Sequence, residues 1–141
     1  MSSKAVEVVA AAIVRDGEVL ATQRGYGEQA GGWEFPGGKV ELGETPEQAL
    51  VREIREELEA DVAIERFLCA VEYDYEAFHL SMRVYVCRFS GGVPRLVEHR
   101  AAQWADAESI ESLEWLPADW EVVRVLEEEG VLRGGAGSSG K

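Results

Sequence analysis

The pattern of apolar and polar residues predicts a chain dominated by strands, with two helices among them. Segments rich in Val, Ile, Ala and aromatic residues, which predict strands, cover residues 6–15, 18–23, 33–35, 63–73, 79–89 and 101–104. The dipeptide Asp16-Gly17 separates the first two segments and is a strong signal for a two-residue hairpin turn. Gly-rich segments at 25–32 and 91–94 predict loops.

The best-defined helix is predicted at residues 46–59. Thr45 and Gln48 have the spacing of a capping box, and Pro46 occupies the first helical position. One side of this helix carries an apolar stripe that consists of Leu50, Val51, Ile54 and Leu58. The stripe predicts that this side packs on the core.

A second helix is predicted at residues 120–129. Asp119 is expected to cap its start, and Gly130 is expected to end it. A helical turn is expected at 108–113. Strands mixed with two main helices predict a sheet that is covered on both faces.

Composition and charge narrow the classes of function. The 141 residues suit one domain, expected over 1–133, followed by a disordered Gly/Ser-rich tail at 134–141. A formal net charge of −13 argues against binding nucleic-acid polymers or anionic membranes through a basic surface. Cys69 and Cys87 have no zinc or redox spacing and are expected to be buried thiols. Because the sequence has no apolar run long enough to cross a membrane, a cytoplasmic protein is expected.

Three glutamates of the first predicted helix carry the strongest chemical signal. At about 100° per residue, Glu53, Glu56 and Glu57 fall within an arc of roughly 100°. Anions this close repel one another and destabilise a bare helix, whereas divalent cations would neutralise them. Mg²⁺ prefers such carboxylate oxygens together with substrate phosphates. The alternative is a solvated acidic face with i,i+4 ion pairs to Arg52 and Arg55.

The residues around these glutamates match a long gapped motif, through which the chain resembles the Nudix hydrolase family. The positions that match the family signature are Gly38, Glu44, Arg52, Glu53, Ile54, Glu56 and Glu57. The sequence departs from the signature at Glu59, where a glycine is usual, and at Ala60, where a larger aliphatic residue is usual. Because that glycine normally ends the helix, the departure bears on the helix terminus more than on the chemistry.

The resemblance covers most of residues 6–129 and points to the MutT-type branch, in particular to CTP pyrophosphohydrolase-like members. Residues 32–39, which read Gly-Trp-Glu-Phe-Pro-Gly-Gly-Lys, are especially typical of it. The resemblance implies an α/β fold, built as an α/β/α sandwich around a mixed sheet. It also implies hydrolysis of a nucleoside triphosphate to the monophosphate and pyrophosphate, with (d)CTP-type or oxidised guanine nucleotides such as 8-oxo-dGTP as substrates.

The resemblance further implies a metal site on the acidic helix. Glu53, Glu56 and Glu57 are the expected ligands, together with the carbonyl of Gly37, and the expected ion is Mg²⁺, or Mn²⁺ in its place. The family also places a catalytic or metal-binding glutamate at the position of Glu98, for which the alternative is an ordinary loop acid. Glu53 and Glu98 are both candidates for the general base.

Four other charged residues are expected to assist. Arg52 and Glu44 would orient the metal ligands, or would form no more than a surface ion pair. Lys39 and Arg24 would meet phosphate oxygens, because Arg24 ends a strand where family members hold a phosphate-binding arginine. The alternative for each of these two cations is a solvated surface residue.

Three residues are expected at the base of the nucleotide. Asp119 lies where MutT-type members place a base-reading Asn or Asp, although a capping role for the last helix is the stronger expectation. When ionised it only accepts hydrogen bonds, which suits a base edge that presents donors. Phe35 and Tyr75 would pack against the base, or within the core as aromatic residues on strands commonly do.

Three other functions stay open at this point. The first keeps the metal site but acts on a nucleoside diphosphate linked to another moiety. The second is a nucleotide-binding module without catalysis, against which the intact Arg-Glu-x-x-Glu-Glu core argues. The third is an acidic interaction protein. The expected partner is a small-molecule nucleotide, and both a monomer and a homodimer are compatible with the sequence.

Overall fold

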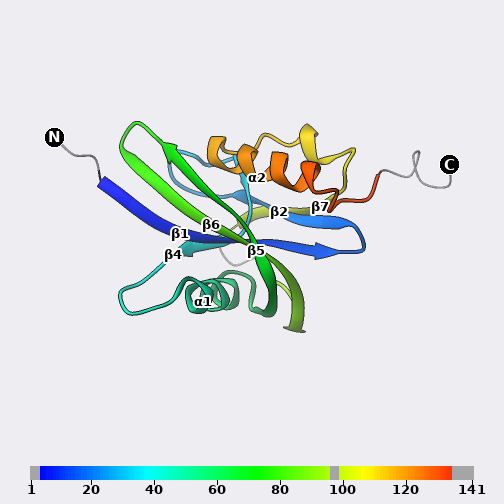
Figure 1. Ribbon diagram of the computed structural model, residues 1–141, viewed down its shortest axis with the longest axis horizontal. Helices are drawn as coiled ribbons and strands as arrows, with labels where there is room; N and C mark the ends of the chain where they lie inside the picture. The colour runs from blue at the N-terminus through cyan, green and yellow to red at the C-terminus, as the bar shows by residue number, and fades with distance from the viewer. Residues whose placement is uncertain (1–3, 96–98, 135–141) are drawn as a thin grey trace.

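A mixed sheet lies between two helices, one on each face. The computed structural model describes residues 4–95 and 99–134. Figure 1 shows helix α1 (Pro46–Leu58) on one side of the sheet and helix α2 (Pro117–Glu128) on the other. The strands are β1 (Lys4–Arg15), β2 (Glu18–Arg24), β3 (Trp33–Glu34), β4 (Gly37–Lys39), β5 (Ala60–Asp74), β6 (Phe78–Gly92) and β7 (His99–Ala105). The predicted α/β/α sandwich is confirmed.

Strand β1 organises this sheet. It pairs in parallel with β6, with Lys4–Ile13 in register with Phe78–Cys87. Its other edge is shared, because β4 pairs with Val8–Ala10 and β2 pairs with the end of β1. The main strand order is β3-β2-β1-β6-β5, and β7 pairs with β2. The predicted hairpin joins β1 to β2 through Asp16 and Gly17, both at positive φ, as a two-residue turn of this type requires.

From Val9 to Val14 both faces of β1 are buried, which explains the continuous apolar sequence there. Its side chains alternate between two cores. The core under α1 contains Val9, Ala11, Ile13, Leu50, Ile54 and Leu58. The core under α2 contains Ala10, Ala12, Val14, Val122, Val123 and Leu126. Leu50, Ile54 and Leu58 of the predicted stripe therefore pack as expected, whereas Val51 is only partly buried.

Helix α1 begins with the predicted capping box. The Gln48 N–H donates to the Thr45 hydroxyl oxygen at 3.1 Å, and the Thr45 N–H donates to the Gln48 side chain at 3.0 Å. The helix ends at Leu58, and its C-cap, Glu59, adopts the left-handed conformation with φ 55°. The usual glycine is thus absent at a position that has the backbone geometry of a glycine cap.

Helix α2 begins three residues earlier than predicted. Pro117 occupies its first turn and Leu116 is the N-cap, which makes no side-chain capping bond. The prediction that Asp119 caps this helix is therefore wrong, because Asp119 lies inside the first turn with its side chain buried. Proline favours the first helical position, and that preference set the boundary.

Other predicted boundaries need smaller corrections. Strands β5 and β6 are longer than predicted, and β6 includes Gly91 and Gly92 of the expected loop. Strand β4 was not predicted, and the expected helical turn is a 3₁₀ helix, Ile110–Ser112. The segment 135–141 of the expected tail lies outside the described residues, as does Glu98. Neither described helix has the length and apolarity needed to cross a membrane.

The left-handed conformation at the end of α1 predicts that Glu59→Gly stabilises the protein. A non-glycine residue in this conformation lowers the free energy of unfolding by about 1–2 kcal/mol. Glycine avoids this cost, but its greater conformational freedom in the unfolded chain cancels about half of the gain. We expect a gain of about 0.5–1 kcal/mol in the free energy of unfolding and a rise in Tm of roughly 2–4 °C, measured by thermal and urea denaturation.

Glu59→Ala is the matched control. It removes the exposed ion pair between Glu59 and Arg95, which are 3.5 Å apart, but it keeps a Cβ in the left-handed conformation. This variant should be no more stable than the wild type. Equal stabilisation by Gly and Ala would show that backbone strain is not the cause.

Candidate active site

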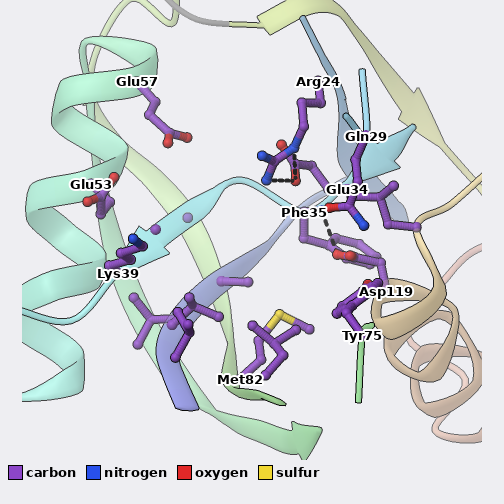
Figure 2. A pocket seen from close by; sticks show the side chains of 18 of the residues that line it. Arg24, Gln29, Glu34, Phe35, Lys39, Glu53, Glu57, Tyr75, Met82 and Asp119 are labelled. Atoms are coloured by element: carbon purple, nitrogen blue, oxygen red, sulfur yellow. Dashed lines mark hydrogen bonds and ion pairs between the residues drawn. The ribbon is translucent and has the colours of Figure 1, made fainter. Parts of the chain in front are cut away.

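A cleft of about 590 Å³ runs from α1 to the first turn of α2, across β1 and β4. Figure 2 shows that its two ends differ in chemistry. The end at α1 is lined by charged residues and glycines, namely Gly37, Gly38, Lys39, Glu53, Glu56 and Glu57. The end at α2 is largely apolar and is lined by Phe35, Tyr75, Phe78, Leu80, Met82, Leu116 and Asp119.

The acidic end of the cleft is built by α1 and β4. Figure 2 shows the side chains of Glu53 and Glu57 reaching from α1 toward the cleft. The Glu53 side chain is only 14% exposed, and a Cβ added at Gly38 would overlap its carboxylate. Gly38 therefore leaves the space into which Glu53 extends. Glu56 lies at the rim, with a side chain that is 60% exposed.

Arg52 holds this acidic cluster together. Its guanidinium donates two hydrogen bonds to Glu44, at 2.6 and 2.9 Å, and one to Glu53 at 3.0 Å. It also reaches Glu56 at 3.3 Å and the backbone carbonyl of Lys39 at 3.0 Å. The hydrogen bonds from Arg52 lower the pKa of Glu44 to about 2, helped by the backbone N–H of Glu41. One guanidinium thus contacts several carboxylates at once. That Arg52 and Glu44 orient metal ligands stays a prediction.

The donor chemistry at this end fits a divalent cation. Carboxylate oxygens of Glu53, Glu56 and Glu57 and the carbonyl of Gly37 are the hard oxygen ligands that Mg²⁺ prefers. Within residues 4–95 and 99–134, however, no three acidic, His or Cys side chains are already gathered in a metal-binding group. The predicted ligand residues therefore line the cleft, but their side chains do not form a ready metal-binding group there.

Arg24 lies between the two ends of the cleft and is bound to Glu34. Its guanidinium donates to one Glu34 oxygen at 2.9 and 3.3 Å, and it lies over the ring of Tyr26. Burial raises the pKa of Glu34, and the charge of Arg24 opposes this rise. Glu34 therefore offsets the positive charge of Arg24. The binding of phosphate by Arg24 stays a prediction.

Asp119 closes the apolar end of the cleft. Its side chain is 6% exposed and accepts a hydrogen bond at 3.1 Å from the backbone N–H of Phe35. The Phe35 ring is buried and stacks on Trp115, with 4.5 Å between the ring centroids. Phe35 thus serves the core and lines the cleft at the same time. The contact joins two residues that are 84 positions apart in the sequence.

Burial raises the pKa of Asp119 to about 8, although the bond from Phe35 lowers it in part. The direction of this shift favours the protonated carboxyl in the folded protein. In contrast to an ionised carboxylate, which only accepts hydrogen bonds, a protonated carboxyl donates one hydrogen bond and accepts others. Burial thus raises the pKa of the acid at the apolar end, whereas Arg52 lowers that of Glu44 behind the opposite end.

Most residues singled out from the sequence meet in this one cleft. It is lined by Arg24, Phe35, Gly37, Lys39, Glu53, Glu56, Glu57, Tyr75 and Asp119. Arg52 and Glu44 stand behind it, and Glu98 lies outside the described residues. Sequence reasoning missed Gln29, Glu34, Phe78, Leu80, Met82 and Leu116 as lining residues. Of these residues, Glu34 lies within residues 32–39, the segment that is typical of the MutT-type branch, and this position could have indicated a role in the site.

Comparison with known proteins agrees with this architecture. The family model for the NUDIX domain matches residues 5–130. A putative 8-oxo-dGTP diphosphatase 2 of Mycobacterium tuberculosis is 44% identical over 114 residues, which cover 79% of this chain and 81% of that protein. The CTP pyrophosphohydrolase of Escherichia coli K12 is 38% identical and covers 82% of this chain and 87% of its own length.

Solved structures show the same fold. The solution structure of the E. coli ORF135 protein superposes with a TM-score of 0.81 at 33% identity, over 99% of this chain and 96% of that one. A MutT NUDIX hydrolase from Burkholderia pseudomallei superposes with a TM-score of 0.70 at 36% identity, over 88% of this chain and 97% of that one.

The fold and the acidic helix define a Nudix-type hydrolase. The chain belongs to the NUDIX family, whose hydrolases generally use divalent metal ions.

The protonated Asp119 predicts a specific pH dependence of stability. Its pKa is raised from an unfolded value of 3.8 to about 8, so the folded state binds the extra proton between these values. The resulting stabilisation is full below the unfolded pKa and is lost as the pH rises through the folded pKa. Relative to Asp119→Asn, the wild type should lose roughly 1 kcal/mol of unfolding free energy per pH unit between about pH 5 and 8.

Urea denaturation of both proteins across this range measures the difference. Asn keeps an oxygen that accepts the Phe35 N–H, so the comparison isolates the titration of residue 119. A stability difference that stays constant from about pH 5 to 8 would show that Asp119 is ionised in the folded protein throughout.

Proposed function

We propose that this protein is a Mg²⁺-dependent nucleoside triphosphate pyrophosphohydrolase that releases a nucleoside monophosphate and pyrophosphate. The observation that carries the proposal is the single cleft in which an acidic helix face meets an apolar pocket with one buried carboxyl. A triphosphate with its metal suits the first end, and a base suits the second. The volume of about 590 Å³ lies in the range of small-molecule sites.

The proposed reaction is an in-line attack of water on the β-phosphorus. The water oxygen bonds to this phosphorus while the bond from it to the α–β bridging oxygen breaks. The nucleoside monophosphate leaves with that oxygen, and the proton of the water passes to a general base. Glu53 or Glu98 accepts this proton.

The charged end of the cleft supplies the remaining groups. We propose that Glu53, Glu56 and Glu57 hold Mg²⁺, or Mn²⁺ in its place, together with the Gly37 carbonyl. The bound ion would neutralise phosphate charge and lower the pKa of a bound water. Arg52 keeps Glu53 and Glu56 in position through the contacts described above, and Lys39 supplies positive charge to the phosphates.

The apolar end is proposed to select the base. Phe35 and Tyr75 contribute aromatic surface, and the protonated Asp119 offers both a donor and an acceptor. Base edges that carry a donor beside an acceptor, as those of cytosine and of oxidised guanine do, suit this carboxyl. The names of the two relatives, an 8-oxo-dGTP diphosphatase and a CTP pyrophosphohydrolase, support the same two substrate classes.

We propose that the substrate is a free nucleotide of the cytoplasm and not a nucleic-acid polymer. The net charge of −13 disfavours a long phosphate backbone, because such a partner requires a basic surface. A short triphosphate needs only the few cations of the cleft and the bound metal ion.

A substrate panel tests the proposed function. The protein is incubated with Mg²⁺ and with canonical and oxidised nucleoside triphosphates, and kcat/KM and both products are measured. We expect monophosphate and pyrophosphate from (d)CTP-type nucleotides or 8-oxo-dGTP, and no turnover after chelation of the metal. Preferred cleavage of nucleoside diphosphate-linked compounds, or saturable binding without metal-dependent turnover, would contradict the proposal.

The proposed role of Glu53 predicts that Glu53→Gln abolishes most turnover. The substitution keeps the size of the side chain but removes a ligand or base, and we expect a loss in kcat of roughly 10²–10⁴-fold. Circular dichroism and thermal unfolding should show an intact fold. The matched control is Glu47→Gln, on the same helix but outside the cleft, where Glu47 accepts from the Tyr85 hydroxyl at 3.2 Å. Near-normal turnover of Glu53→Gln would refute the assignment.

A further inference from the structure

Helix α2 begins at the base end of the cleft without a side-chain cap of its own. Its N-cap, Leu116, makes no capping bond, and Pro117 has no N–H. The N–H of Ala118 instead donates to the hydroxyl of Tyr75 at 3.1 Å. Tyr75 comes from 43 positions earlier in the sequence, so the first turn of α2 is capped by a distant residue.

Tyr75 is itself held firmly in the turn between β5 and β6. Its N–H donates to the carbonyl of Phe78 at 2.9 Å. Its ring packs on Phe78 and Tyr73, with ring centroids 5.2 and 4.8 Å apart. This one hydroxyl therefore joins the β5–β6 turn to the start of α2.

The residue that follows Ala118 is the buried acid of the cleft. Asp119 lies in the same first turn, and its carboxyl accepts the N–H of Phe35 at 3.1 Å. Figure 2 shows Tyr75 and Asp119 close together at this end of the cleft, below Phe35. A shift of the first turn would move the carboxyl relative to Phe35 and to anything bound in the cleft.

We propose that the Tyr75 hydroxyl is a positioning group for base selection, which holds the first turn of α2 so that the Asp119 carboxyl keeps its place at Phe35. The effect on substrate rests on the proposed function. The aromatic ring and the hydroxyl have separate roles, because the ring packs on Phe78 and Tyr73 and the hydroxyl accepts the N–H of Ala118.

Tyr75→Phe separates the two roles, since it removes the hydroxyl and keeps the ring. We expect KM for the preferred triphosphate to rise about five- to tenfold, the effect of one lost hydrogen bond, with kcat changed less than about twofold. In the Asp119→Asn background the same substitution should cause little further loss, because the hydroxyl acts through residue 119. Tyr73→Phe is the control: it removes a neighbouring hydroxyl from β5 and should leave KM unchanged.

Amide hydrogen exchange tests the positioning itself in the free protein. In Tyr75→Phe the Ala118 and Phe35 amides should exchange about fivefold faster or more, while amides in the core of β1 keep their rates. This readout needs no turnover. Faster exchange in a protein that hydrolyses no triphosphate would support the positioning role and defeat the proposed function.

Two outcomes would overturn the inference. Unchanged exchange at Ala118 and Phe35 would show that the hydroxyl does not hold the turn. Independent, additive losses in KM for Tyr75→Phe and Asp119→Asn would show that Tyr75 contacts the base directly and does not act through Asp119.

Discussion

The burial of β1 on both faces is the constraint on which the rest of the structure depends. The strand has small or β-branched side chains on each face, so both helices pack closely against it. Its pairing with β6 fills one edge, and β4 and β2 divide the other edge between them. Because β4 takes the first part of that edge, the segment Gly37–Lys39 runs beside α1 (Figure 1).

The close approach of β4 to β1 requires glycine. A Cβ at Gly37 would overlap the carbonyl of Val9, and one at Gly38 would overlap the carboxylate of Glu53. Gly37 therefore allows β4 to pair closely with β1, and Gly38 leaves room for the Glu53 side chain of the acidic helix. Two neighbouring glycines thus connect the packing of the sheet with the geometry of the site.

Local sequence signals predicted the parts of the fold that depend on local interactions. The capping box at Thr45 and the Asp16-Gly17 hairpin involve residues within a few positions of each other, and both are present in the structure. The acidic wall of the cleft was predicted for the same reason, since the spacing along one helix places Glu53 and Glu57 on one side. Strand β4 was not predicted, because the sequence Gly-Gly-Lys has no preference for strands. This segment is a strand only through its pairing with β1.

The apolar end of the cleft shows why the remaining part could not be predicted. Asp119 is buried and accepts the backbone N–H of Phe35, and the N–H of Ala118 at the start of its helix donates to Tyr75; both contacts join distant parts of the chain. The same acidic chemistry then has opposite consequences at the two ends. Arg52 keeps the pKa of Glu44 at about 2, whereas burial raises that of Asp119 to about 8. The two ends rest on different elements, α1 with β4 and α2 with the β5–β6 turn. Under the proposed function, substitutions at the apolar end would therefore alter selectivity for the base while the charged end keeps its geometry.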